Sequence, residues 1–409
     1  MVASGSSALV AGAIFAGTYL VLAVGQPPLF RIDRTGAAII GAILMIAVGG
    51  LSLDDAWRSI DYRTIVLLFG MMVVVAHLRL SLFFSLVARR IVGALDNPIA
   101  LLVAVVFATG LLSAVFVNDT MCLVFTPVII EVARARRQSP VPFLIALATA
   151  SNIGSTAAIT GNPQNMLIGS LSRIGYRQFT AALAPIAIVG LAIDAAGIAA
   201  VYRRELRVSA PATVETGVRT VHRAMMVKGL IVAGGVVAGF LAGWDTALVA
   251  ASAAAVLMIT RRVKPEKIYA SIDGGLLVLF MGLFIVIRGI EEAGLDRAFF
   301  EMLRPIGVST VWGLSLVSAL LSNLTSNVPA VMLFTRIVPQ LPDPTNAWLT
   351  LAMSSTLAGN LTLLGSIANL IVVEGARRHG IRITFGEYLK VGIPVTLATL
   401  GVGVWWLSR

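Results

Sequence analysis

Long apolar runs separated by short charged loops are the feature that most constrains the fold of this 409-residue chain. A helix needs about 20 apolar residues to cross a lipid bilayer. Hydrophobic residues make up 58% of the chain and charged residues 12%, whereas a typical soluble domain has about 25% charged residues. The pattern therefore predicts an all-α polytopic membrane protein. It excludes a disordered chain, a coiled coil and an ordinary cytosolic enzyme.

Read between charged residues, the apolar runs fall at roughly 8–24, 36–53, 64–78, 98–117, 120–133, 141–172, 178–201, 229–244, 246–260, 274–288, 305–326, 328–340, 346–373 and 391–407. The stretch 98–133 is too long for one crossing and too short for two with an exposed loop, and its middle, 117–120, is polar. The run 141–172 is broken by Gly, Pro, amide and hydroxyl residues at 151–156 and 160–165. We expect a re-entrant hairpin followed by a broken span, because unwound backbone at membrane depth must line a cavity or be buried in protein.

The chain matches itself at an offset slightly above 200 residues. The matching positions include Gly70 with Gly282, Asn118 with Asn327, Gly161 with Gly365, and Asn165 with Asn369. The ordered series predicts a first repeat at 1–201, a basic cytoplasmic linker at 202–228 and a second repeat at 229–409. Each repeat is expected to hold three spans, a re-entrant hairpin, a broken span and a final span. This is an odd number of crossings, so we expect the second repeat to be inverted.

The net charge of +11 comes from Lys and Arg in the short loops between apolar runs. Such loops lie on the cytoplasmic side of a membrane. The charge therefore indicates membrane topology and not binding to nucleic acid. It predicts a multi-pass protein of the inner (cytoplasmic) membrane, with the lipid bilayer as its surroundings.

Inverted repeats with broken helices are typical of secondary transporters, whose sites lie where half-helix ends face a shared cavity near the midplane. Helix N-termini favour anions and unwound carbonyls favour cations. We therefore expect the two hairpin tips and the two broken spans to meet. The candidate substrate-binding residues are Asn118, Thr120, Asn152, Asn165, Ser326, Asn327 and Asn369. The candidate ion-coupling residues are Asp119, Asn118, Gly161, Asn327 and Gly365.

Asp119 is the sharpest single candidate, because an ionisable side chain at membrane depth is costly and usually functional. The second repeat has Val328 at the equivalent place, so the acid is unmatched. It could bind a proton or a cation. The alternative is that Asp119 only caps a helix that starts at Thr120. Asp194, inside the run 178–201, is either a second proton site or an acid satisfied within the bundle.

No cofactor and no metal site are expected. The single cysteine, Cys122, excludes a Cys-based zinc site and an iron–sulfur cluster. No H-E-x-x-H motif is present, so an intramembrane enzyme is not expected. The repeated broken spans favour a carrier over a channel.

The residues around the first hairpin and broken span resemble those of the ion transporter superfamily. The tip Asn118-Asp119 and the segments 151–155 and 161–165 look most like its branch of ArsB-type arsenite permeases, Lsi2-type silicic acid exporters and NhaD-type sodium/proton antiporters. Related divalent-anion/sodium symporters carry Ser-Asn-Thr at each tip, and neither tip here has that triplet. The resemblance covers essentially the whole chain and implies a similar fold.

By this resemblance, the chain would export a small uncharged metalloid oxyacid, of the arsenite, antimonite or silicic acid type, against protons. The residues agree on one point: a single cysteine cannot form a three-thiolate arsenite site, so amides and hydroxyls would have to hold the substrate. Two alternatives stay open. One is a sodium- or proton-coupled symporter of an inorganic anion or dicarboxylate, and the other is a sodium/proton antiporter. The resemblance also implies a possible homodimer.

Overall fold

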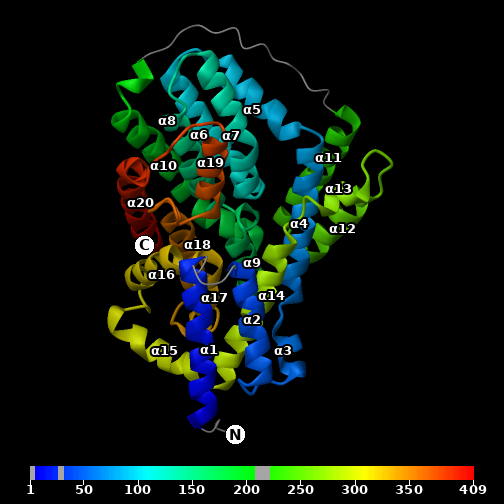
Figure 1. The fold of residues 1–409 in the computed structure, drawn as a ribbon, viewed down its shortest axis with the longest axis vertical. Helices are drawn as coiled ribbons and strands as arrows, with labels where there is room; N and C mark the ends of the chain where they lie inside the picture. The colour runs from blue at the N-terminus through cyan, green and yellow to red at the C-terminus, as the bar shows by residue number, and fades with distance from the viewer. Residues whose placement is uncertain (1–4, 26–31, 208–221) are drawn as a thin grey trace.

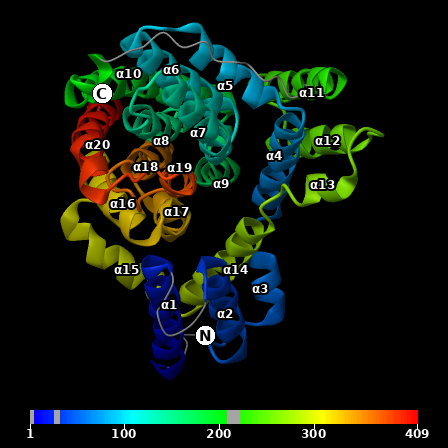
Figure 2. The same ribbon diagram turned by 45° about the horizontal axis from the view of Figure 1, so that its top comes forward.

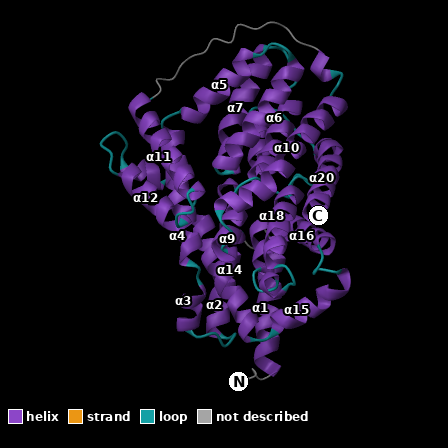
Figure 3. Cartoon of the chain, turned by 180° about the vertical axis from the view of Figure 1, so that it is seen from behind, coloured by secondary structure: helices purple, strands orange, loops and turns teal. Residues whose placement is uncertain are grey.

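A computed structural model describes residues 5–25, 32–207 and 222–409 of the chain. The described part is helical and contains no strand (Figure 3). The helices of the first half are α1 (Gly5–Val24), α2 (Arg34–Ala47), α3 (Leu53–Ser59), α4 (Tyr62–Leu80), α5 (Phe83–Ala94), α6 (Pro98–Val115), α7 (Asn118–Ala135), α8 (Val141–Ser155), η1 (Ile159–Gly161), α9 (Pro163–Ser172), α10 (Tyr176–Val201) and η2 (Glu205–Arg207). Those of the second half are α11 (Arg223–Leu241), α12 (Thr246–Met258), α13 (Pro265–Tyr269), α14 (Gly274–Glu292), α15 (Leu295–Leu303), η3 (Arg304–Ile306), α16 (Val311–Thr325), α17 (Asn327–Phe334), η4 (Val338–Gln340), α18 (Pro344–Ala358), α19 (Ile367–Arg378) and α20 (Phe385–Leu407).

Six of these helices are long and apolar enough to cross a membrane, or up to seven if one sharply bent helix pair is a single span. The count covers the described residues only. Together with the wholly helical fold, it confirms the prediction of an all-α polytopic membrane protein.

The order of helices α1 to α10 recurs in α11 to α20 (Figure 1). In each series a pair of helices joined by a tight break, α6–α7 and α16–α17, precedes a pair joined by a longer break, α8–α9 and α18–α19. The inverted relation of the two repeats and their boundaries at 201 and 229 stay predictions. Most of the predicted linker, residues 208–221, lies outside the described residues.

The helices form two groups, which Figures 1 and 2 show from different angles. We call α1 to α4 and α11 to α14 the support helices, and α5 to α10 and α15 to α20 the site helices. Within the support helices each series packs on the other, since α2 lies along α14 and α12 lies along α4.

Matched glycines allow these two close contacts. A Cβ atom on Gly70 of α4 would lie 2.6 Å from the carbonyl oxygen of Ala250 on α12. A Cβ atom on Gly282 of α14 would lie 2.8 Å from the carbonyl oxygen of Ala38 on α2. Small residues of this kind let membrane helices approach backbone to backbone. The match between Gly70 and Gly282 in the sequence thus corresponds to two equivalent crossings.

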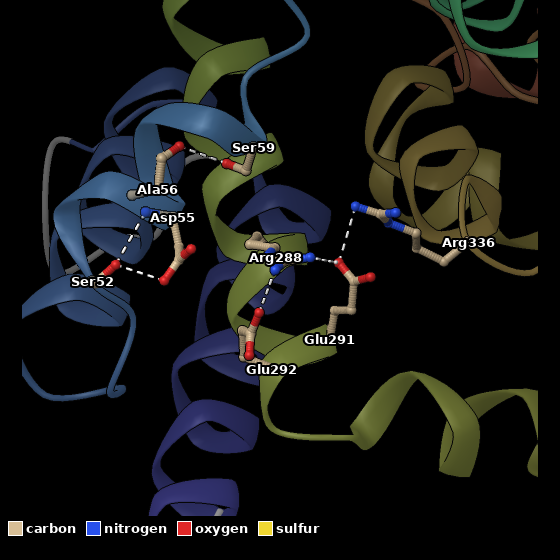
Figure 4. A network of polar contacts seen from close by, with 8 residues as sticks. All are labelled: Ser52, Asp55, Ala56, Ser59, Arg288, Glu291, Glu292 and Arg336. Atoms are coloured by element: carbon tan, nitrogen blue, oxygen red, sulfur yellow. Dashed lines mark hydrogen bonds and ion pairs between the residues drawn. The ribbon is translucent and has the colours of Figure 1, made fainter. Parts of the chain in front are cut away.

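Polar contacts join the second hairpin to the support helices. Glu291 of α14 forms an ion pair with Arg336, which follows α17, at a distance of 2.9 Å (Figure 4). Arg288, one turn earlier on α14, pairs with both Glu291 and Glu292. The hydroxyl of Tyr19 on α1 donates to the carbonyl oxygen of Pro329 on α17 at 3.1 Å. The α17 arm of this hairpin is therefore tied to α1 and α14.

Candidate functional site

Four helices begin at one place among the site helices. They are α7, α9, α17 and α19, which start just after the two hairpin tips and the two broken-span interruptions. The interruptions lie at 116–117, 156–162, 326 and 359–366. The first two are within a few residues of the predicted breaks at 117–120 and 151–165, but residues 118–120 and 151–155 are helical. Because helix N-termini carry partial positive charge and free N–H groups, they can bind an anion or polar oxygen atoms.

Asn152, near the end of α8, is the hub of a buried hydrogen-bond network. Its Oδ1 accepts from Asn118 Nδ2 at the first hairpin tip and from Ser366 Oγ in the second broken span, both at 3.0 Å. Its Nδ2 donates to Asn360 Oδ1 at 2.8 Å and to Asn369 Oδ1 at 3.1 Å. These four bonds use the full capacity of one amide side chain. The predicted residues Asn118, Asn152 and Asn369 are thus in direct contact.

Asn165 and Asn369 make equivalent hydrogen bonds to the backbone of the two broken spans. Asn165 Nδ2 donates to the carbonyl oxygens of Ser155 and Ala158 at 3.0 and 3.2 Å. Asn369 Nδ2 donates to the carbonyl oxygens of Gly359 and Thr362 at 2.8 and 3.1 Å. Each amide thereby satisfies backbone groups that the break leaves without a helical partner. Neither asparagine starts its half-helix, because Asn162 and Ser366 are the N-caps of α9 and α19.

The two broken spans also bind each other in matched pairs. Ser366 donates to Asn152, and the equivalent Asn162 donates from Nδ2 to Thr356 Oγ1 at 3.2 Å. Asn152 bonds Asn369, and the equivalent Thr356 donates to Asn165 Oδ1 across a longer 3.5 Å. Each pair is repeated at the same sequence spacing. The centre of the molecule is therefore a shared structure built by both halves of the chain.

Gly161 and Gly365 lie at the tightest points of the two interruptions. A Cβ atom on Gly161 would lie 2.2 Å from the carbonyl oxygen of Ser155. On Gly365 it would lie 2.7 Å from Asn323 Oδ1 and 2.9 Å from the carbonyl oxygen of Gly359. Both glycines let the unwound backbone fold against the end of the preceding half-helix.

The two hairpin tips differ in their contacts. Asn118 is bonded to Asn152, whereas Asn327 Oδ1 is buried with no hydrogen-bond partner among the described residues. The Asn327 amide instead lies beside Gly359, at the end of α18. Ser326, which is half-buried, has a φ of 78°, a left-handed conformation that is strained for a residue with a side chain. The second tip therefore presents a free amide oxygen close to the network.

Asp119 lies in the first turn of α7 and does not cap it. The N-cap position is Val117, with no side-chain cap bond, and α7 begins at Asn118 and not at Thr120. The Asp119 side chain is half-buried and makes no hydrogen bond or ion pair that involves the described residues. The neighbouring Thr120 is also half-buried. The capping alternative for Asp119 is thus wrong, and its carboxyl is available to a ligand or a proton.

We call the hydrogen-bonded residues Asn118, Asn152, Asn162, Thr356, Asn360, Ser366 and Asn369 the polar centre, and no basic side chain of the described residues bonds to them. Its hydrogen bonds, as far as the described residues show them, come from amides, hydroxyls and backbone groups. In the same part of the chain no three His, Cys, Asp or Glu residues are grouped as metal ligands. The arrangement can hold a small polar molecule by donors and acceptors of neutral type.

A family model described as a citrate transporter, CitMHS, matches residues 19–358. The chain belongs to the citrate transporter family. This family member is 31% identical to the silicon efflux transporter LSI3 of rice, in a match that covers 97% of each protein. It is 23% identical to the arsenical pump membrane protein of Escherichia coli, with 96% of this chain and 97% of that protein covered.

A solved structure, that of the Neisseria gonorrhoeae efflux pump MtrF, resembles the fold with a TM-score of 0.60 at 11% identity. The match covers 98% of this chain and 94% of the MtrF chain. The protein is thus a multi-pass secondary transporter of the superfamily that the sequence resembles, and not an enzyme.

Two residues near the centre were not predicted from the sequence, Thr356 and Asn323. Thr356 takes the place that Asn152 has in the first repeat, and the change from amide to hydroxyl hides the match. Asn323 donates to the carbonyl oxygens of Ala319 and Ala358 and accepts from Thr362, but it lies four residues before Asn327, outside the polar tip itself. The spacing between Asn165 and Asn369 is the signal that identifies Thr356, since it pairs that residue with Asn152.

Proposed function

We propose that this protein is a proton-coupled carrier that exports a small, uncharged metalloid hydroxy acid such as arsenite, antimonite or silicic acid. The observation that carries the proposal is the composition of the centre and its hairpin tips: the described residues there offer amides, hydroxyls and one unpaired carboxyl, that of Asp119, but no Lys or Arg. Such groups match the hydroxyls of a neutral acid, which donate and accept hydrogen bonds. A multiply charged anion would have only helix N-termini to balance it.

In this proposal the substrate binds between the two hairpin tips. Asn118 and Asn327 contact its hydroxyls, and Ser326 and Thr120 line the same space. Asn152, Asn165 and Asn369 hold the broken spans in place. Gly161 and Gly365 allow the unwound backbone to lie close against the end of the preceding half-helix. Asp119 carries the coupling proton, since its carboxyl has no hydrogen-bond or ion-pair partner among the described residues and lies at a tip that a moving substrate must pass. We further propose the cytoplasmic membrane as the location and a homodimer as the assembly.

The names of two relatives support this substrate class, because one is a silicon efflux transporter and the other an arsenical pump membrane protein. A second candidate is a sodium- or proton-coupled anion symporter. The four converging helix N-termini favour it, as they would stabilise negative charge. A sodium/proton antiporter remains the third candidate, with Asp119 as the cation ligand.

Flux into proteoliposomes separates these candidates. The purified protein would be reconstituted and offered arsenite, silicic acid, succinate, sulfate or sodium under an imposed pH gradient or sodium gradient. We expect movement of arsenite or silicic acid that depends on the pH gradient and is unaffected by sodium. Sodium-driven uptake of succinate or sulfate without metalloid movement would instead establish the symporter. Protein-free liposomes are the control.

A further inference from the structure

A second carboxyl lies deep among the site helices, away from the hairpin tips. Asp194 on α10 is 0% exposed. Its Oδ2 accepts a hydrogen bond from Thr149 Oγ1 of α8 at 2.9 Å, and its Oδ1 has no partner among the described residues. An ionised carboxylate with a single hydroxyl donor and no cation is costly to bury. Such groups in transmembrane segments commonly mark proton or ion pathways.

In the part of the chain that the structure describes, no basic side chain pairs with Asp194. Helices α6, α8 and α18 contain no titratable residue, and neither does η1. The neighbouring helices α11 and α20 contribute Arg223, Lys228, Glu387, Tyr388 and Lys390. Among the described residues, none of these five forms a hydrogen bond or ion pair with Asp194. The Thr149 hydroxyl is therefore the one group in the described part of the chain that is bonded to this carboxyl.

A short route connects Asp194 to the polar centre. Asp194 Oδ2 is bonded to the Thr149 hydroxyl, and the backbone carbonyl of Thr149 accepts from Asn360 Nδ2 at 3.0 Å. Asn360 in turn bonds Asn152. One residue, Thr149, thus separates the carboxyl from an amide that joins the broken spans.

We propose that Asp194 is a second proton-binding site of the transport cycle, distinct from Asp119, and that Thr149 transmits its protonation to α8. The Thr149 hydroxyl has one hydrogen and three acceptors within reach: Asp194 Oδ2 and the carbonyl oxygen of Ile145, each at 2.9 Å, and the carbonyl oxygen of Ala146 at 3.4 Å. When Asp194 is protonated, its O–H donates to Thr149, which donates to Ile145. When the proton leaves, the Thr149 hydroxyl turns to the carboxylate and releases the Ile145 carbonyl. Three residues further along the same helix lies Asn152.

This proposal rests on the proposed proton coupling, but infrared spectroscopy tests it without any transport. A protonated carboxylic acid has a C=O stretching band that a carboxylate lacks. We would titrate the full-length protein in lipid nanodiscs and compare wild type with Asp194→Asn, Thr149→Val and Asp119→Asn. Thr399→Val is a matched control, because Thr399 is a buried threonine that also bonds the carbonyl four residues earlier but forms no hydrogen bond with an acid of the described residues.

We expect a carboxylic acid band that disappears as the pH rises, is absent in Asp194→Asn and persists in Asp119→Asn. Thr149→Val should shift this band and Thr399→Val should not. A band that is missing, or that does not change across the accessible pH range, would overturn the proposal. If Asp194→Asn does not fold, the comparison of the two threonine variants still decides the matter.

Flux measurements add a readout that a purely structural acid would not affect. In Asp194→Asn the amide oxygen can still accept from Thr149, so the fold should persist. We expect substrate exchange to continue while flux driven by a pH gradient falls to the level of empty liposomes. Unaltered gradient-driven flux would contradict the role of Asp194. Conversely, the infrared result with no metalloid movement in wild type would leave Asp194 as a proton site and refute the substrate class proposed above.

Discussion

The side-chain amide of Asn152 donates to Asn369 Oδ1 at 3.1 Å and so joins the first broken span to the second. The two residues are 0–1% exposed and lie 217 positions apart in the chain. A hydrogen bond of this kind means that neither broken span can be rearranged without affecting the other.

Replacement of Asn152 by Ala is expected to destabilise the protein strongly. The change removes four hydrogen bonds and leaves the side chains of Asn118, Asn360, Asn369 and Ser366 without one partner each. We expect a loss of about 2–3 kcal/mol of stability, because buried polar groups without partners are costly. Thermal unfolding in detergent would measure it. Asn346→Ala, which removes a single half-buried bond to the carbonyl of Leu407, is the matched control and should shift the unfolding temperature much less.

Alanine at Gly161 or Gly365 should also be destabilising, on the order of 1–3 kcal/mol for each overpacked site. The new methyl group would overlap the carbonyl oxygen of Ser155 at one site and the Asn323 side chain at the other. Gly234→Ala on α11 is the control, since a Cβ atom there meets nothing within 4 Å. It should be neutral or stabilising, because alanine favours a helix by up to about 1 kcal/mol. Equal effects at all three sites would argue against the close approach.

The ion pair between Glu291 and Arg336 is expected to couple α14 to the second hairpin. Its side chains are 25% and 47% exposed, so we expect a coupling energy of only about 0.5–1 kcal/mol. A double-mutant cycle with Glu291→Gln and Arg336→Gln would measure it through thermal stability. Glu301 of α15 and Arg304 of η3 form an exposed ion pair within one short segment before the second hairpin. This pair should give a coupling energy near zero. Similar values for the two pairs would indicate that Glu291 and Arg336 do not hold the hairpin.

The sequence predicted the interruptions of the spans better than it predicted what fills them. Pro, Gly and Asn within apolar runs identify broken helices, because each disfavours continuous helix for a known reason. The interruption at 156–162 was therefore predictable to within a few residues. Pairing between the two halves was not, since no local pattern tells which amide of one break faces which hydroxyl of the other. Thr356 shows this, as its partners Asn162 and Gln164 lie more than 190 residues away in the chain.

The short helices before each hairpin were also not predicted. Helices α5 and α15 mix apolar with charged residues, so neither helix forms an uninterrupted apolar run. The capping interpretation of Asp119 failed for a related reason. Whether a helix starts at residue 118 or 120 depends on tertiary packing at the tip, which a sequence pattern does not specify.

The most direct test of the account is a comparison of two fluxes in the Asp119→Asn variant. Its central claim is that the centre made by the two broken spans and the two hairpin tips binds a neutral substrate, while Asp119 carries the coupling proton. Proteoliposomes would be used to measure arsenite exchange at equal pH and arsenite transport driven by a pH gradient. We predict that exchange persists in the variant and that gradient-driven transport is lost. If both rates match those of wild type, Asp119 does not couple proton movement to transport and the mechanism is wrong.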